Sequence, residues 1–266
     1  MTDKVVKILH LSSRWKLAVK TTPLVIFIIL LKLLIHYLGY EFLTLNALFT
    51  AIISANIFLI GFLISGVLAD YKESEKIPSD IASSIATMAD EGLIIIKNKN
   101  SVEAKNYLHH LKNFNESLIY WFYKKEKTEN IMKQLKDFND YFLAFENQTQ
   151  ANFIARLKQE QSLLRKIVNR VHTIRETSFC GTGYAITEII TFFLTLGMIF
   201  IKIEPFYESI FFISFVSFIL IYMIFFIKDL DNPFGYSKED SLVEEVSLKP
   251  VLDSQKRLEE YCKSIV

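Results

Sequence analysis

The feature that most constrains this sequence is the stretch Leu43–Pro78, LTLNALFTAIISANIFLIGFLISGVLADYKESEKIP. Its first part, from Leu43 to Leu68, contains about 26 residues without a single charge. An uncharged apolar run of more than about 20 residues is long enough to cross the hydrocarbon core of a bilayer as a helix. The stretch therefore predicts a membrane-spanning helix, which ends where Asp70 opens a charged segment closed by Pro78.

Small residues recur along this stretch at a spacing of four. The rows are Ala47, Ala51 and Ala55, and then Gly61, Ser65 and Ala69. A spacing of four places each row on one face of a helix, and small side chains let a second helix approach closely in a membrane. Gly61, Ser65 and Ala69 are therefore candidate helix-packing residues.

Phe58 and Phe62 have the same spacing, with Ser54 one turn earlier. These three residues share one face of the helix. We interpret the helix as a packed membrane helix whose Ser54, Phe58 and Phe62 face is a candidate pore lining. The alternative is that both phenylalanines face lipid or a neighbouring span.

The composition indicates a membrane protein with a sizeable water-exposed part. Hydrophobic residues make up 51% of the chain and charged residues still make up 22%, so the apolar residues must be segregated into blocks. Cys180 and Cys262 are too few and too far apart for a disulfide framework or a zinc site. The net charge of +1 does not indicate a nucleic-acid partner.

The first span is expected from about Pro23 to Tyr40, with Pro23 in the first helical turn. It is interrupted only by Lys32 and His36. Ionisable groups inside a membrane are costly and often line a polar path. The simpler interpretation is that Lys32 snorkels toward the interface and that His36 lies near the outer interface.

After the second span, Pro78 and Ser79 are expected to begin a water-soluble helical region, with Ser79 as an N-cap. Asn98 and Asn100 predict a break. Further helices are predicted over residues 102–122, 131–145 and 151–174, and one in the tail between Ser254 and Ile265. No strand-like alternation is convincing, so the predicted class is all-α.

Two more apolar runs predict a third span at about residues 185–203 and a fourth at 210–227. Glu188 lies near the start of the third span, and one hypothesis pairs it with Lys32. Because basic residues lie in the N-terminal arm and before the third span, both termini and the central region are expected in the cytoplasm. The expected parts are a basic interfacial arm (1–22), hairpin 1 (23–69), a cytosolic helical region (70–181), hairpin 2 (182–228) and a cytosolic tail (229–266).

Signatures of catalysis are lacking in the sequence. It contains no phosphate-binding glycine loop, HExxH, CxxC or nucleophile elbow. His109 and His110 are adjacent on a predicted helix, so they point in different directions and make a poor metal-binding pair. We therefore expect no enzyme activity, no metal and no cofactor.

Two short segments resemble one known family. Phe58-Leu-Ile-Gly-Phe62, followed by a charged segment and Pro78, is similar to the second span of bestrophins. The tetrad Asn232, Pro233, Phe234 and Gly235 directly follows the fourth span, as the NPFG tetrad does in bestrophins. The order of arm, hairpin, cytosolic insert and second hairpin also resembles this family, in particular its divergent bacterial branch.

The resemblance implies a homopentameric anion (chloride) channel of the cell inner membrane. Its second spans would line a central pore, and the hydrophobic neck of the family falls at Ser54, Phe58 and Phe62. Ser54 departs from the bulky residue usual at that place, which implies a shorter or wider neck. The implied partners are the lipid bilayer, further copies of the chain and a permeating anion.

The calcium site of animal bestrophins follows NPFG with a dense acidic run. Here Tyr236, Ser237 and Lys238 come before Glu239 and Asp240. Calcium prefers six to eight oxygen ligands, several of them carboxylates, so we expect no calcium gate. The alternative to a channel is a non-conducting membrane protein whose cytosolic bundle binds a partner or senses the state of the membrane.

Overall fold

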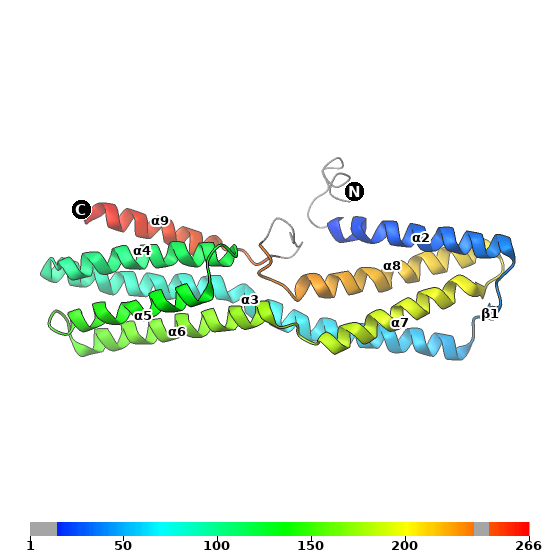
Figure 1. Ribbon diagram of the computed structural model, residues 1–266, viewed down its shortest axis with the longest axis horizontal. Coiled ribbons are helices and arrows are strands. Elements are labelled where there is room, and N and C mark those ends of the chain that lie inside the picture. Colours follow the sequence, from blue (N-terminus) through cyan, green and yellow to red (C-terminus); the bar gives the residue numbers. More distant parts are fainter. Residues whose placement is uncertain (1–14, 237–244, 266) are drawn as a thin grey trace. The chain divides into compact units, whose positions relative to one another are not determined.

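A computed structural model describes residues 15–236 and 245–265 of the chain (Figure 1). The first 14 residues of the predicted arm lie outside the described residues, as do Glu239 and Asp240. The chain divides into two compact units. The first, residues 1–71 and 178–231, is called the membrane unit below, and the second, residues 72–177 and 232–266, the helical unit.

The membrane unit is built from α2 (Lys16–Leu38), the first part of α3 (Ala47–Lys99), α7 (Gly181–Phe200) and α8 (Phe206–Leu230). Within the described residues, four helical stretches are long and apolar enough to cross a membrane, and α7 is the apolar part of the third. The all-α class and the four spans are thereby confirmed.

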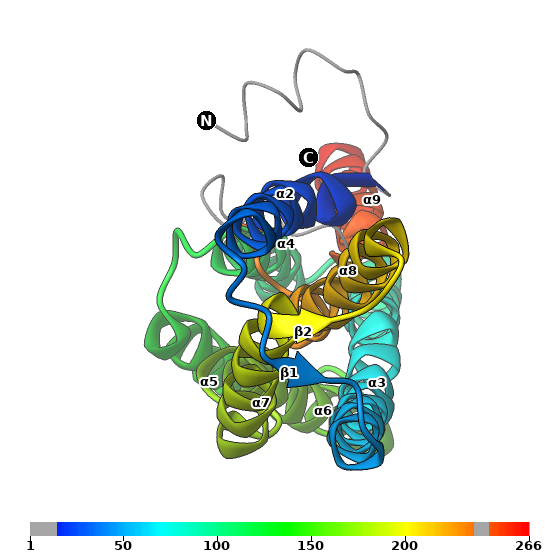
Figure 2. The ribbon, with the colours of Figure 1, turned by 90° about the vertical axis from the view of Figure 1, so that its right-hand side faces the viewer.

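Two short strands join the links of the hairpins. β1 (Leu43–Thr44) pairs in parallel with β2 (Ile201–Lys202), so the two links lie side by side (Figure 2). Strands of two residues are too short for an alternating pattern to be visible in the sequence. They add a local connection to a fold that is otherwise helical.

The core of the membrane unit lies where α3 meets α7 and α8. Buried apolar side chains form two clusters: Ile60, Leu63, Val67, Leu194, Leu220, Ile227 and Leu230, and then Ile28, Met198, Ile199, Ile201 and Ile213. Ile60, Leu63 and Val67 recur at helical spacing, so this face of α3 is the one that packs inside the unit.

The prediction that Pro23 lies in the first turn of its helix is wrong, because α2 begins at Lys16 and Pro23 lies inside it. A proline interrupts one backbone hydrogen bond of a helix. Two neighbouring hydroxyls bond nearby carbonyls, from Thr21 Oγ1 to Leu17 O and from Thr22 Oγ1 to Ala18 O, both at 2.8 Å.

The predicted helix start at Ser79 is also wrong, because α3 runs through Pro78 to Lys99. An interior proline costs about 3 kcal/mol. The apolar stripe nevertheless continues across it, with Ile77, Ile81 and Ile85 all buried. Burying each such side chain contributes about 1.5–3 kcal/mol, which outweighs the cost of the proline. The break predicted at Asn98 and Asn100 is confirmed, since α3 ends at Lys99.

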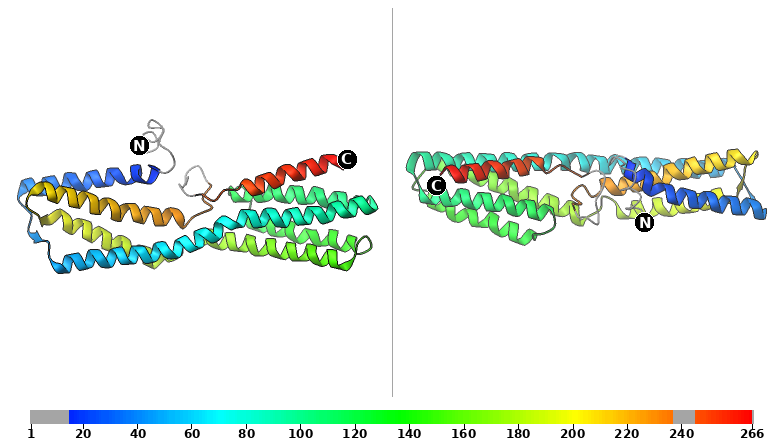
Figure 3. Two further views of the ribbon diagram at one scale, coloured as in Figure 1. Left: turned by 180° about the vertical axis from the view of Figure 1, so that it is seen from behind. Right: turned by 90° about the horizontal axis from the view of Figure 1, so that it is seen from above.

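The helical unit contains the second part of α3 with α4 (Val102–Phe122), α5 (Thr128–Phe145), α6 (Ala151–Glu176) and α9 (Lys249–Ser264) (Figure 3). α4 has the predicted bounds, and its N-cap Ser101 accepts a hydrogen bond from Ala104 N at 3.1 Å. Aromatic side chains fill the centre of the unit: Tyr107, Phe114, Trp121, Phe122, Phe138, Phe142 and Phe145 are all buried.

Candidate functional site

The candidate site is the face of α3 that turns away from the core of the membrane unit. Phe58 and Phe62 are 78% and 62% exposed, and Ser54 is exposed as well. On the opposite face of the same helix, Asn56 is fully buried and donates a hydrogen bond from Nδ2 to Thr191 Oγ1 at 2.9 Å. One face of α3 therefore packs inside the membrane unit, and the opposite face is exposed.

The open face has an unusual composition. Between Ala47 and Ala69, the residues within about 60° of Phe58 around the helix axis are Ala47, Ala51, Ser54, Ala55, Phe58, Gly61, Phe62, Ser65 and Ala69, and every one is exposed. We call this set the exposed α3 face. Phe58 and Phe62 are its two large side chains, and none of its members is charged.

Gly61 shows how open this face is. A methyl group added at Gly61 would have no atom within 4 Å, whereas one added at Gly66 would lie 2.1 Å from the Phe179 ring. Within the described part of one chain, no helix approaches the row of Gly61, Ser65 and Ala69 closely. Packing of another helix against this row stays a prediction, and Gly66 is the close-packed glycine that sequence reasoning missed.

Lys32 is fully buried inside the membrane unit. Its Nζ donates to Ile199 O at 3.2 Å and to Ile201 O at 2.5 Å, and it forms an ion pair with Glu41. The ammonium group therefore has carbonyl and carboxylate partners within the unit, and its position relative to the membrane interface stays a prediction. One signal for the carboxylate partner is visible in the sequence: Glu41 is the lone glutamate in the short link after the first span.

Glu41 also accepts a hydrogen bond from His36. His36 Nδ1 lies 2.9 Å from Glu41 Oε2, and the His36 ring stacks on Phe206 at 3.6 Å between centroids. Burial acts to raise the pKa of Glu41, but hydrogen bonds from Lys32 and His36 outweigh it and hold the pKa below its ordinary value. The three side chains form one connected cluster at the links of the hairpins, called the Lys32 cluster below.

Glu188 pairs with Lys228 and not with Lys32, so the hypothesis of a Lys32–Glu188 pair is wrong. Glu188 Oε1 lies 2.6 Å from Lys228 Nζ, and both side chains are about half exposed, at 42% and 51%. Lys32 is in the second half of α2, whereas Glu188 is in the first half of α7. Each charge therefore has its own partner.

The tetrad Asn232–Gly235 follows α8 and packs within the helical unit. Phe234 is fully buried, and its ring lies 5.6 Å from that of Phe122 between centroids. The backbone nitrogen of Val246 donates to Pro233 O at 3.1 Å, and Tyr236 Oη donates to Val246 O at 2.5 Å. The tetrad therefore contributes to the packing of the helical unit, mainly through Phe234.

Metal-binding clusters are not found among the described residues, where no group of three His, Cys, Asp or Glu side chains could hold an ion. His110 Nε2 lies 3.1 Å from Gln134 O, and its ring lies 4.6 Å from that of Phe138. The calcium question at Glu239 and Asp240 falls outside the described residues.

No protein-family model matches the sequence, and no curated protein matches it either. Several solved structures match the fold of the chain. One bestrophin homologue from Klebsiella pneumoniae with a point mutation is 15% identical, with a TM-score of 0.75 over 90% of this chain and 99% of that one. A second mutant form of that homologue is 13% identical, with a TM-score of 0.74 over 90% of this chain and 97% of that one.

A third structure, described as a membrane protein, is 15% identical with a TM-score of 0.72 over 92% of this chain and 97% of that one. At these identities the likeness establishes the fold, and it covers nearly the whole of each chain. Together with the four apolar helices, it identifies the chain as a membrane protein with a bestrophin-like fold.

Proposed function

We propose that the chain is one subunit of a homo-oligomeric ion channel, a pentamer, in which the exposed α3 face of each copy lines a central pore. The observation that carries this proposal is the composition of that face. It combines small, uncharged residues with Phe58 and Phe62 and is exposed along its whole length. Its bestrophin-like fold supports the same assembly.

Rings of Phe58 and Phe62 form the neck of the proposed pore. Small side chains at Ala47, Ala51 and Ser65 leave the pore wider on both sides of these rings. A constriction of apolar side chains controls conduction by expelling water or by forcing ions to lose part of their hydration. Because the edge of an aromatic ring is its positive part, ring edges directed into the pore favour anions.

Lys32 is assigned a different role from the neck. It is fully buried on α2 and bonded to the carbonyls of Ile199 and Ile201, so it does not offer a charge to a permeating ion. Its role in the proposal is to hold the two hairpin links together. In the same proposal, the four spans lie in the inner membrane, and both termini and residues 70–181 lie in the cytoplasm.

The decisive experiment is reconstitution of the purified protein in planar bilayers. We expect wild-type currents whose reversal potential in a KCl gradient follows chloride. Phe58→Ala and Phe62→Ala should raise the conductance, because each removes one apolar ring. The matched control is Phe192→Ala on α7, since Phe192 is 62% exposed, as Phe62 is, but lies outside the exposed α3 face.

Two results contradict the proposal. A monomer in mild detergent excludes a pore between copies. Currents that are absent in all variants exclude a channel and favour the alternative of a non-conducting membrane protein that binds a partner, and currents that Phe192→Ala alters as much as Phe58→Ala and Phe62→Ala exclude a specific neck. A reversal potential that follows potassium contradicts anion selectivity alone.

A further inference from the structure

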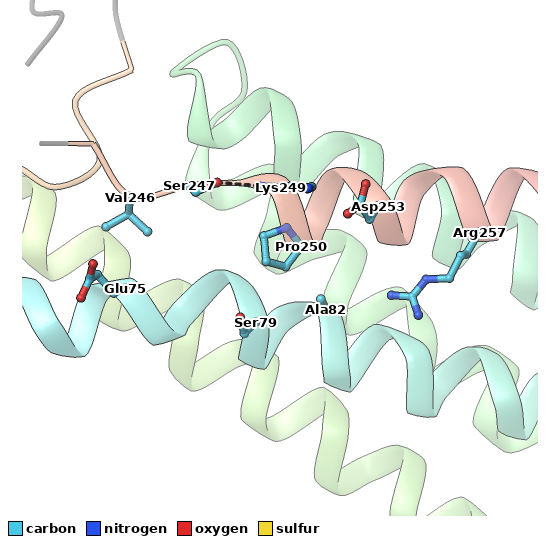
Figure 4. Close-up of a pocket in the computed structure, with 9 residues that line it drawn as sticks. All are labelled: Glu75, Ser79, Ala82, Val246, Ser247, Lys249, Pro250, Asp253 and Arg257. Atoms are coloured by element: carbon cyan, nitrogen blue, oxygen red, sulfur yellow. Dashed lines mark hydrogen bonds between the residues drawn. The ribbon is translucent and has the colours of Figure 1, made fainter. Parts of the chain in front are cut away.

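A second candidate site lies inside the helical unit, between α3 and α9. An open cleft of about 680 Å³ is lined by Glu75, Ser79, Ala82, Val246, Ser247, Lys249, Pro250, Asp253 and Arg257 (Figure 4). Small-molecule sites in proteins typically occupy about 300–1,000 Å³. The cleft is therefore large enough for a metabolite, and it uses none of the residues of the proposed pore.

The cleft exists because α9 packs on α4 rather than on α3. Asn115 Nδ2 of α4 donates to Val251 O at 3.2 Å and to Gln255 Oε1 at 2.9 Å, which fixes the first half of α9. The facing side of α3 carries Glu75 at one end and then the small side chains of Ser79 and Ala82. Small residues normally let helices close up, but here the space between α3 and α9 stays open.

Charges of both signs line this space. On α9, Lys249, Asp253 and Arg257 follow at intervals of one helical turn, so they share a face. Glu75 lies near one end of the cleft, and Arg257 reaches toward α3 near the other (Figure 4). With two acids and two bases, the lining has no net charge.

Most of these charges have no partner among the residues that the structure describes. Among the described residues, Glu75 and Lys249 form no ion pair, and Arg257 is hydrogen-bonded only to Ser254 Oγ at 3.2 Å. Asp253 has one long contact, 3.9 Å from Lys256 Nζ. A ligand could therefore bond these groups without breaking a strong interaction.

We propose that this cleft binds an elongated zwitterionic small molecule, with its cationic group at Glu75 and its anionic group at Arg257. A zwitterion matches a neutral lining that holds both signs, whereas a ligand of one sign meets a like charge at one end. Glu75 and Ala82 are separated by on the order of 10 Å along α3, which favours an extended ligand over a compact α-amino acid. Ala82, Val246 and Pro250 supply apolar contacts for its middle part.

The probe for this site is 6-aminohexanoate, titrated by calorimetry into the full chain in detergent. Hexanoate and hexylamine serve as probes with one charge each. We expect saturable binding of 6-aminohexanoate, with either single-charge probe about tenfold or more weaker, since each removes one charge-assisted contact. Glu75→Gln and Arg257→Gln should each weaken binding by a similar factor.

The matched controls are Asp90→Asn on α3 and Glu259→Gln on α9, two exposed carboxylates that do not line the cleft. They should leave the affinity unchanged. Ala82→Leu narrows the cleft without changing a charge and should weaken binding while thermal unfolding stays cooperative.

The proposal is overturned if 6-aminohexanoate does not bind, if hexanoate or hexylamine binds equally well, or if Glu75→Gln and Arg257→Gln bind as tightly as the controls. The readout is binding and not current, so failure of the channel proposal would leave this result unaffected, and the reverse also holds.

Discussion

The two units differ in where they place phenylalanine: it is buried in the helical unit and largely exposed in the membrane unit. In the helical unit, Phe138 and Phe142 are buried against Tyr107, whereas in the membrane unit Phe58, Phe192 and Phe211 are each more than half exposed. An apolar side chain must leave water to contribute to stability, but it loses nothing by facing lipid. The difference teaches that exposure means different things in the two units.

The strongest test of this difference between the units is the same substitution, phenylalanine to alanine, made in each of them. Phe138→Ala should lower the free energy of unfolding of the helical unit by about 3–5 kcal/mol, because it leaves a cavity in a packed core. Phe192→Ala should change the stability of the membrane unit by about 0.5 kcal/mol or less. Hydrogen exchange of the full chain, read separately in each unit, measures both effects, and equal losses would contradict the comparison.

Buried charge gives the next largest effect. Glu41→Gln leaves Lys32 buried with carbonyl partners but without its carboxylate, which should cost about 3 kcal/mol. Combining it with Lys32→Met removes the buried charge as well and should recover much of the loss. Thermal unfolding in detergent measures the series, and a double variant no more stable than Glu41→Gln would show that the Lys32 cluster is not a charge pair in energetic terms.

The pH dependence of the same pair has a definite sign. The pKa of Glu41 is lowered from its ordinary value of 4.5, so its ionised form is favoured in the folded state. The stability that Glu41 contributes is thus present above pH 4.5 and is lost as the pH falls through the lower folded value. Wild type and Glu41→Gln should converge in stability in acid, and a constant difference down to that range would refute this assignment.

The smallest effects come from two glycines of α3. Gly66→Ala should destabilise the membrane unit by about 1–3 kcal/mol, because the Phe179 ring occupies the space of the new methyl group. Gly61→Ala meets no atom and should stabilise the helix by about 0.5–1 kcal/mol in a single chain. If another copy packs against Gly61, the same change should instead weaken the oligomer, which size-exclusion chromatography with light scattering can detect.

Much of the fold was predictable because the apolar blocks are long and their periodicity is strong. The bounds of α4 follow from a capping serine and a clear apolar stripe. Pro23 and Pro78 misled the prediction because a local rule favours a helix end at proline, whereas the burial that continues past Pro78 is a sum over many residues.

The candidate site was predictable in part. The shared face of Ser54, Phe58 and Phe62 follows from spacing alone, and the exposure of that face needed the structure. The lone Glu41 in the link was a usable signal for the carboxylate partner of Lys32. The other two partners could not be derived, because Ile199 and Ile201 bind through backbone atoms. The α3–α9 cleft needed the structure too, since it depends on which helix α9 packs against.

Lys32 also constrains how the chain enters the membrane during synthesis. A lysine within a spanning helix raises the free energy of insertion, by up to about 2.5–3.5 kcal/mol where it lies at the centre of the helix. When α2 leaves the ribosome, Ile199 and Ile201 have not yet been made, but Glu41 follows soon after. We therefore expect the first hairpin to insert as a pair of helices with its own counter-charge, and Lys32 to reach its remaining partners only when the second hairpin arrives.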